Sequence, residues 1–350
     1  AIRDPVSNSF FFNELGERVN NKDILERSDA SGDTKSYGAV FHINDNLRVF
    51  YNESNNFGLP STSRFEYPDH STARNTIGEG FDYGIGFSFL DNRISGRASR
   101  FETDSNNIYR SGLNLTGLND ALWEAALLNT DVTGVTQADV DANFISGTGG
   151  IYDQHVEGYE FAMTANLTSN WRLILRYSYT DGIQTNTYPD QVEYFAGDPD
   201  GRLGGFGGIS YFDRPEWANL PLADGGEDTI GALIAEWEAD LAEGRAADGI
   251  NLARNRPHKM NVFTRYDFDE GALKGFFIGG GYKWADATQL GVGRDGNGNI
   301  FPLEGDDYET FDFLLGYRIG KLFGLKNTTI QLNVTNIFDW DEFIITGRDV

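Results

Sequence analysis

The chain has 350 residues, of which 28 are basic and 53 acidic, so its formal net charge at pH 7 is −25. This balance argues against a nucleic-acid-binding protein, which needs a basic surface to displace counterions from phosphates. The absence of cysteine excludes a disulfide scaffold, a thiolate zinc site and a thiol nucleophile. The sequence contains no run of about 18 apolar residues, so no transmembrane helix is predicted. Its high aromatic and glycine content is still compatible with a membrane β-barrel.

Ten segments of the chain have the period-2 alternation of β-strands, in which successive side chains point to opposite faces. In 171–179, for example, Trp171, Leu173 and Leu175 share one face, while Arg172 and Arg176 share the other. Short turns rich in Asn, Asp and Gly join the segments in pairs, as tight hairpins require. The five predicted hairpins occupy about 37–53, 82–103, 158–180, 259–284 and 310–337.

The connections between these hairpins are long, at about 54–81, 104–156, 181–257 and 285–309. Compact soluble domains seldom contain such loops, because their median connection is about 4–6 residues. Outer-membrane barrels combine short periplasmic turns with long extracellular loops. The strict alternation of short and long connections therefore predicts an all-β, antiparallel transmembrane barrel.

The two faces of the predicted strands have different environments in this fold. Lipid offers no partner for backbone N–H and C=O groups, so strands that cross it must pair on both sides and close into a ring. We expect the apolar face to meet lipid and the charged face to line the lumen. The predicted lumen-facing residues are Glu160, Arg172, Arg176, Arg265, Asp312 and Arg318.

Two of the long loops contain helical patterns, in Asn119–Leu128 and Thr229–Gly244. Their apolar residues recur at the spacing of one helix face, and Gly244 is typical of a helix end. We interpret both as short helices that pack within extracellular loops, with a role in gripping a ligand as the alternative.

The loop at 181–256 is acidic and aromatic, with 15 acidic and 5 basic residues. The acidic residues indicate a solvated surface or, alternatively, a vestibule that concentrates cations. Aromatic rings in this loop can stack on a sugar or a catecholate, or they can anchor the loop on itself. The candidate ligand-binding aromatics are Tyr188, Tyr194, Phe206, Tyr211 and Trp217.

The sequence predicts neither a catalytic site nor a resident cofactor. It contains no G-x-S-x-G or H-E-x-x-H motif, and its four histidines have no close metal-ligand spacing. Asp295-Gly296-Asn297-Gly298-Asn299 alternates oxygen ligands like the start of an EF-hand loop, but it lacks Gly at the sixth and Glu at the twelfth position. A plain loop is favoured there over a Ca²⁺ site.

The segment Gln331-Leu332-Asn333-Val334-Thr335-Asn336-Ile337-Phe338-Asp339 resembles the end of TonB-dependent outer-membrane transporters. The resemblance implies a 22-stranded barrel with a plug domain inside it and energy delivered through TonB. No segment resembling the plug is seen, so we expect these residues to form the C-terminal part of the barrel.

The leading hypothesis is thus active uptake of a scarce solute, such as a siderophore or an oligosaccharide, in the outer membrane of a Gram-negative bacterium. Expected partners are outer-membrane lipid and lipopolysaccharide, TonB through the plug region, a surface lipoprotein and the solute. A passive porin or structural barrel is the second hypothesis. A soluble secreted β-protein that binds glycans is the third.

Overall fold

The computed structural model describes residues 31–60, 73–145, 149–199, 201, 207–252, 255–296, 300–322 and 325–339. Its main element is one sheet of ten antiparallel strands in the order β1-β2-β3-β4-β5-β6-β7-β8-β11-β12. The strands are β1 (Lys35–Asn44), β2 (Leu47–Gly58), β3 (Thr76–Phe89), β4 (Ile94–Arg110), β5 (Gly150–Asn166), β6 (Trp171–Thr185), β7 (His258–Asp267), β8 (Phe276–Ala285), β11 (Tyr308–Leu322) and β12 (Leu325–Val334). The predicted all-β antiparallel fold is confirmed.

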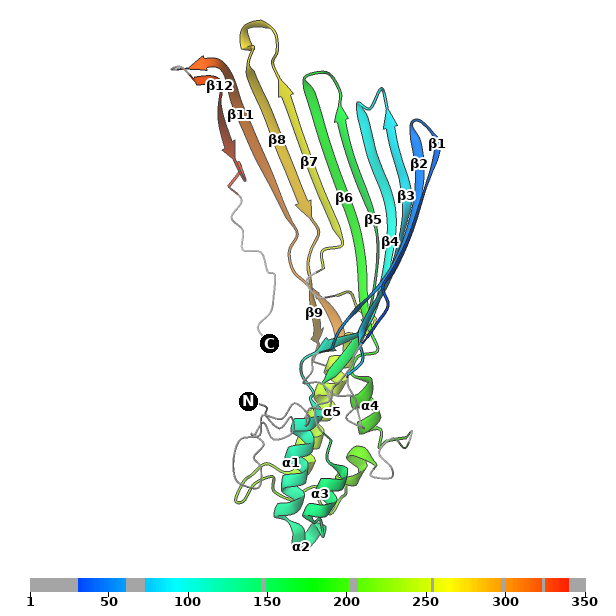
Figure 1. Cartoon of the computed structure of the whole chain (residues 1–350). Coiled ribbons are helices and arrows are strands. Elements are labelled where there is room, and N and C mark those ends of the chain that lie inside the picture. Colours follow the sequence, from blue (N-terminus) through cyan, green and yellow to red (C-terminus); the bar gives the residue numbers. More distant parts are fainter. Residues whose placement is uncertain are drawn as a thin grey trace, which may run out of the picture.

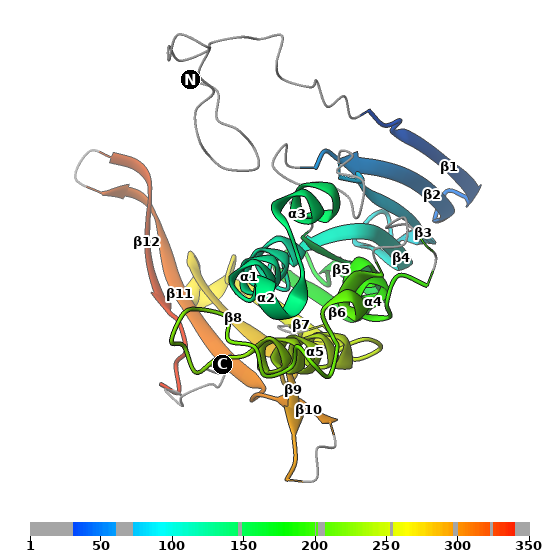
Figure 2. The ribbon, with the colours of Figure 1, turned by 90° about the horizontal axis from the view of Figure 1, so that it is seen from below.

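The sheet curves into an open trough (Figures 1 and 2). Among the described strands, β1 and β12 each pair with a single neighbour, so these ten strands do not close a ring. The total of 22 strands therefore stays a prediction.

Short and long connections alternate along the chain. The short turns that join β1 to β2, β3 to β4, β5 to β6, β7 to β8 and β11 to β12 lie at one end of the sheet (Figure 1). The long connections lie at the opposite end, because each antiparallel hairpin returns the chain to the end from which it started.

Several strands extend beyond the ranges that the sequence predicts. The first hairpin reaches Gly58 rather than 53, and β4 continues to Arg110 rather than 103. These extensions contain polar residues on both faces, as in Ser54-Asn55-Asn56. Alternation of apolar and polar residues predicts only strand segments with one apolar face, so it does not detect them. The predicted loop at 285–309 also contains a small hairpin, β9 (Gln289–Arg294) and β10 (Ile300–Glu304).

The long connections carry a helical cluster below the sheet (Figure 1). It comprises α1 (Leu115–Leu128), α2 (Thr130–Thr133), α3 (Gln137–Asn143), α4 (Pro189–Phe195), α5 (Ile230–Ala246) and the 3₁₀ turn η1 (Gly208–Tyr211). Another 3₁₀ turn, η2 (Gly271–Leu273), joins β7 to β8. No helix in the described ranges is both long enough and apolar enough to span a bilayer.

The loop cluster has a hydrophobic core of its own. Leu115, Leu118 and Leu122 of α1 are buried against residues of α5 and of the segment around η1. Asn114 caps α1, because its side-chain oxygen accepts a hydrogen bond from the backbone N–H of Thr116 at 3.0 Å. The long loops therefore pack together as a folded unit.

Within the described part of the chain, no such core forms on the apolar face of the sheet. Large apolar side chains are exposed along it, including Phe41, Ile85, Leu315 and Leu332. A row of rings crosses it near the long-loop end, in which Tyr51 lies opposite Tyr83, and Tyr159 opposite Tyr179. A band of exposed apolar side chains edged by aromatic rings is the surface that a membrane barrel presents to lipid.

Candidate functional site: the polar face and the loop cluster

The opposite face of the sheet, here called the polar face, carries the charged side chains of the strands. Cross-strand register places Arg172 of β6 opposite Arg265 of β7, and Glu160 of β5 opposite Ser178 of β6. Alternation along the strands puts all six predicted lumen residues on this face: Glu160, Arg172, Arg176, Arg265, Asp312 and Arg318. Their assignment to a lumen remains a prediction, because the described strands do not close.

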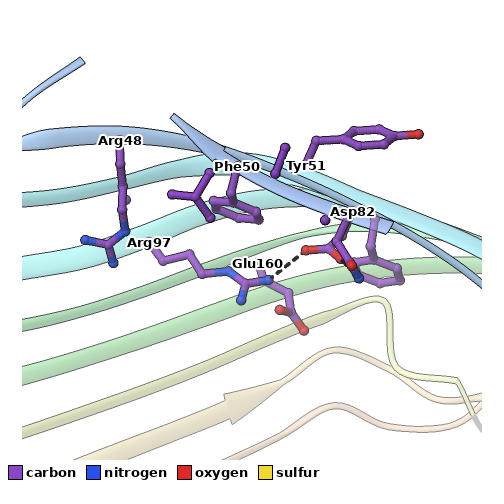
Figure 3. A pocket seen from close by; sticks show the side chains of 12 residues that line it. Arg48, Phe50, Tyr51, Asp82, Arg97 and Glu160 are labelled. Carbon is purple, nitrogen blue, oxygen red and sulfur yellow. Dashed lines mark hydrogen bonds and ion pairs between the residues drawn. The ribbon is translucent and has the colours of Figure 1, made fainter. Parts of the chain in front are cut away.

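A hollow of about 680 Å³ lies on the polar face over β1 to β5 (Figure 3). At its centre, Arg97 Nη2 lies 3.3 Å from Asp82 Oδ2. The Asn52 amide donates to the other oxygen of Asp82 at 3.1 Å, and the Arg97 guanidinium lies over the Phe50 ring, 4.7 Å from its centroid. Glu160 also lines this hollow (Figure 3).

The arrangement in this hollow gives it a mixed character. Two guanidinium groups, Arg48 and Arg97, and two carboxylates, Asp82 and Glu160, line it together with the aromatic residues Phe50, Tyr51 and Phe101. Such a surface can hydrogen-bond a polar solute or a polar protein surface. Of these residues, only Glu160 was a predicted site residue. Arg48, Asp82 and Arg97 could have been identified in the same way, because the period-2 alternation within 47–53 and 82–103 places them on the polar face.

A second charged group lies at the turn end of the polar face. Asp267 Oδ1 accepts from Arg265 at 2.8 Å and from Arg318 at 2.7 Å. The Arg265 guanidinium also covers the ring of Phe277 at 3.9 Å from its centroid. Further along the face, Lys283 Nζ lies 2.8 Å from Asp312 Oδ2. Three of the predicted lumen residues therefore take part in ion pairs within the sheet.

The candidate ligand-binding aromatics have a different environment. Tyr194 is 0% exposed, Tyr188 and Trp217 are almost fully buried, and Tyr211 is half-buried. Phe206 lies outside the described residues. The Tyr194 hydroxyl donates to the amide oxygen of buried Asn119 at 3.3 Å. A ligand could reach these buried rings only if the loop cluster opened, so their binding role stays a prediction.

Tyr188 joins the loop cluster to the ends of the strands. Its backbone N–H donates to the carbonyl of Ile151 in β5, its hydroxyl donates to the carbonyl of Ser111, and the Arg110 guanidinium lies over its ring at 5.5 Å. Burial raises the pKa of the Tyr188 hydroxyl. Tyr188 thus acts as a packing residue in this conformation.

The predicted weak Ca²⁺ site cannot be located as a whole. Asp295 and Gly296 are described, whereas 297–299 lie outside the described residues. Ca²⁺ binding there stays a prediction.

Comparison with known proteins agrees with this architecture. Residues 11–337 match the family model described as TonB dependent receptor-like, beta-barrel. The chain therefore belongs to the family of TonB-dependent receptor β-barrels, which are outer-membrane proteins of Gram-negative bacteria. It is a family of receptors and transporters rather than of enzymes. No curated protein sequence matches the chain significantly.

Solved structures of TonB-dependent receptors resemble the chain at low sequence identity. The FpvAI–pyocin S2 complex matches with a TM-score of 0.51 and 17% identity, covering 89% of this chain and 29% of that one. The ferripyoverdine receptor of Pseudomonas aeruginosa bound to ferripyoverdine has a TM-score of 0.49 and 17% identity, covering 87% and 29%. The ferric-catecholate import receptor Fiu of E. coli K12 has a TM-score of 0.48 and 18% identity, covering 87% and 30%. The chain thus spans less than a third of the length of these structures.

Proposed function

We propose that this chain is part of the barrel wall of a transporter that takes up a scarce solute across the outer membrane with energy from TonB. The observation that carries the proposal is the division of a continuous curved sheet into an apolar, aromatic-edged face and a charged face. Placing an Arg or Lys at mid-bilayer on the lipid side would cost about 2–4 kcal/mol, so the charged face is assigned to the interior.

In this proposal, the apolar face contacts membrane lipid and lipopolysaccharide, and the loop cluster faces the outside of the cell. The polar face, including the Asp82–Arg97 hollow, lines the route of the solute or contacts a plug domain. The solute is a siderophore, an oligosaccharide or a molecule of similar size, and a surface lipoprotein is a further candidate partner. Family membership supports this assignment, since the family couples uptake to TonB.

The test compares uptake by the full-length protein in cells with and without TonB. Radiolabelled iron bound to a catecholate or a hydroxamate siderophore, and a labelled oligosaccharide, serve as probes in a strain from which the gene has been deleted. We expect the restored gene to increase uptake of one probe only in cells that contain TonB. Equal entry in TonB-deficient cells would instead establish a passive porin.

A further inference from the structure

A cluster of three metal-ligating side chains lies on the apolar side of the sheet, beyond its aromatic row. Register places Arg100 of β4 opposite Tyr159 in that row. Glu102 and Asp104 follow on the same face, two and four residues closer to the long-loop end. At about 3.3 Å per residue, Asp104 is about 13 Å beyond the aromatic row. The cluster therefore lies outside the apolar band, and the polar-face hollow is on the other side of the sheet.

The geometry of the cluster suits a single small cation. Asp104 of β4 and His155 of β5 are direct cross-strand partners, and His155 Nδ1 lies 2.8 Å from Asp104 Oδ1. The ligand atoms of Glu102, Asp104 and His155 all lie within 4.8 Å of one another. Atoms that bind one zinc ion at about 2.0–2.2 Å are separated by roughly 3 to 3.5 Å. The His155–Asp104 pair already has nearly this spacing.

Of the three side chains, Glu102 is the one whose carboxylate has to shift to share a cation with Asp104 and His155. Among the described residues, its carboxylate pairs with Arg100, whose Nη2 lies 3.5 Å away. Arg100 makes its shorter contact with Glu157, at 2.6 Å. Glu102 is therefore held weakly, and a change of side-chain rotamer can bring its carboxylate to a cation between Asp104 and His155.

The surroundings of the cluster are strongly negative. Four more carboxylates lie near the cluster on the same face of the sheet: Glu53, Glu79, Glu157 and Asp181. Across the part of the chain that the structure describes, Asp181 Oδ1 is one of the few buried side-chain oxygens without a hydrogen-bond partner. A hollow of about 390 Å³ adjoins the cluster and is lined by Glu53, Glu79, Glu102 and Asp104, with Lys35 among its other residues. This field attracts a divalent cation.

We propose that Glu102, Asp104 and His155 bind a divalent transition-metal cation of the Zn²⁺ class on the outer wall of the sheet. The imidazole nitrogen favours such a metal over Ca²⁺ or Mg²⁺, which prefer ligand sets made of oxygen alone. Two carboxylates balance the charge of the ion. The metal joins β4 to β5 across a 51-residue separation, and water fills its remaining positions.

The test titrates Zn²⁺ into the full-length protein, purified in detergent and stripped with a chelator, by isothermal calorimetry. Asp104→Asn and His155→Ala are each expected to weaken one binding event about tenfold or more, and Glu102→Gln to weaken it less. His42→Ala is the matched control, because this exposed histidine belongs to β1, away from the cluster. Ca²⁺ at the same concentration is expected to compete poorly.

Folding of each variant is checked by its heat-dependent mobility in gel electrophoresis. X-ray absorption of the zinc-loaded protein provides a second readout, in which we expect one nitrogen ligand of the imidazole type to be lost in His155→Ala. Zinc binding that is unchanged in Asp104→Asn and His155→Ala, or no binding by the unaltered protein at millimolar Zn²⁺, would overturn the proposal.

Discussion

Gly316 leaves space on the polar face for the ring of a residue on the neighbouring strand. It lies opposite Phe277 across β11 and β8, and a Cβ atom at 316 would overlap the Phe277 ring. Phe277 is 1% exposed, and Arg265 covers the ring at 3.9 Å. The ring therefore has little room to retreat, which explains the absence of a side chain at 316.

We predict that Gly316→Ala lowers the free energy of unfolding of the full-length protein by about 1–3 kcal/mol, because it overpacks this contact. Urea titration in detergent, followed by tryptophan fluorescence, measures the change. Gly320→Ala is the control on the same strand, since among the described residues, its chain neighbours aside, no heavy atom lies within 4 Å of the position of its Cβ. Equal effects of the two substitutions would show that overlap with Phe277 is not the cause.

Asp139 is a residue whose ionisation stabilises a helix start in the loop cluster. Its Oδ2 accepts from the backbone N–H of Thr136 at 2.8 Å and from the Thr136 hydroxyl at 2.6 Å. These hydrogen bonds, the side-chain one first, lower the pKa of Asp139 in the folded protein. The carboxylate therefore stabilises α3 above the unfolded-state pKa, and this contribution is lost as the pH falls through the lower folded-state pKa.

We predict that amide exchange in 137–143, corrected for intrinsic rates, becomes faster in Asp139→Asn at neutral pH. The difference from the unaltered protein should shrink as the pH falls below about 4, the unfolded-state pKa of an aspartate. Hydrogen exchange with mass spectrometry gives the rates. Asp131→Asn changes an exposed carboxylate of α2 instead and should leave exchange in α3 unchanged. A pH-independent difference would contradict the role of ionisation.

At the scale of elements, α1 supplies the main apolar face of the loop cluster. Leu122 is fully buried, whereas Leu128 at the end of the same helix is 46% exposed. Asn119, also fully buried, satisfies its amide by donating to the Leu115 carbonyl and accepting from Tyr194. The helix therefore makes a stabilising contact to a segment 75 residues away.

We predict that Leu122→Ala destabilises the loop cluster by about 2–5 kcal/mol, through lost burial and the cavity left behind. Hydrogen exchange should accelerate in α1, α4 and α5 while the strands keep their protection. Leu128→Ala has the same chemistry at an exposed site of α1 and should change exchange little. If the strands lost protection equally, the loop cluster and the sheet would form a single cooperative unit.

For the whole molecule, the chemistry of the two faces indicates which side of the sheet contacts lipid and which side faces the interior. Leu175 lies on the apolar face, opposite Met163 and Val262, and Ile174 lies on the polar face, opposite Thr164 and Phe263. The two residues are adjacent in β6 and share the same depth. Substituting each by the same charged residue therefore isolates the environment of the face.

We predict that Leu175→Arg reduces membrane assembly of the full-length protein, because an arginine in mid-bilayer costs about 2–4 kcal/mol. Ile174→Arg should be tolerated better, since its guanidinium faces the interior. The folded fraction in isolated outer membranes, read from heat-dependent gel mobility, compares the two. Tolerance of Leu175→Arg together with loss of folding in Ile174→Arg would reverse the assignment of the faces.

Local sequence pattern was enough to predict the strands, their two faces and the alternation of short turns with long loops. These features depend on local periodicity and on turn residues, which neighbouring positions in the chain specify. Thus Arg172 and Leu173 could be assigned to opposite faces without a structure. The polar ends of the strands, such as Ser54-Asn55-Asn56, could not be recognised because they lack an apolar face.

Which distant residues meet depends on strand pairing and loop packing, which local sequence pattern does not specify. The Asp82–Arg97 hollow, the contact of Tyr194 with Asn119 and the cluster of Asp104 with His155 all depend on the register of strands or the packing of loops. Such contacts join residues 15 to 75 positions apart, and side-chain types alone do not specify them. For the same reason, Tyr194 and Trp217, which have the right chemistry for a ligand, are buried in the core of the loop cluster, where tertiary packing rather than residue type sets their accessibility.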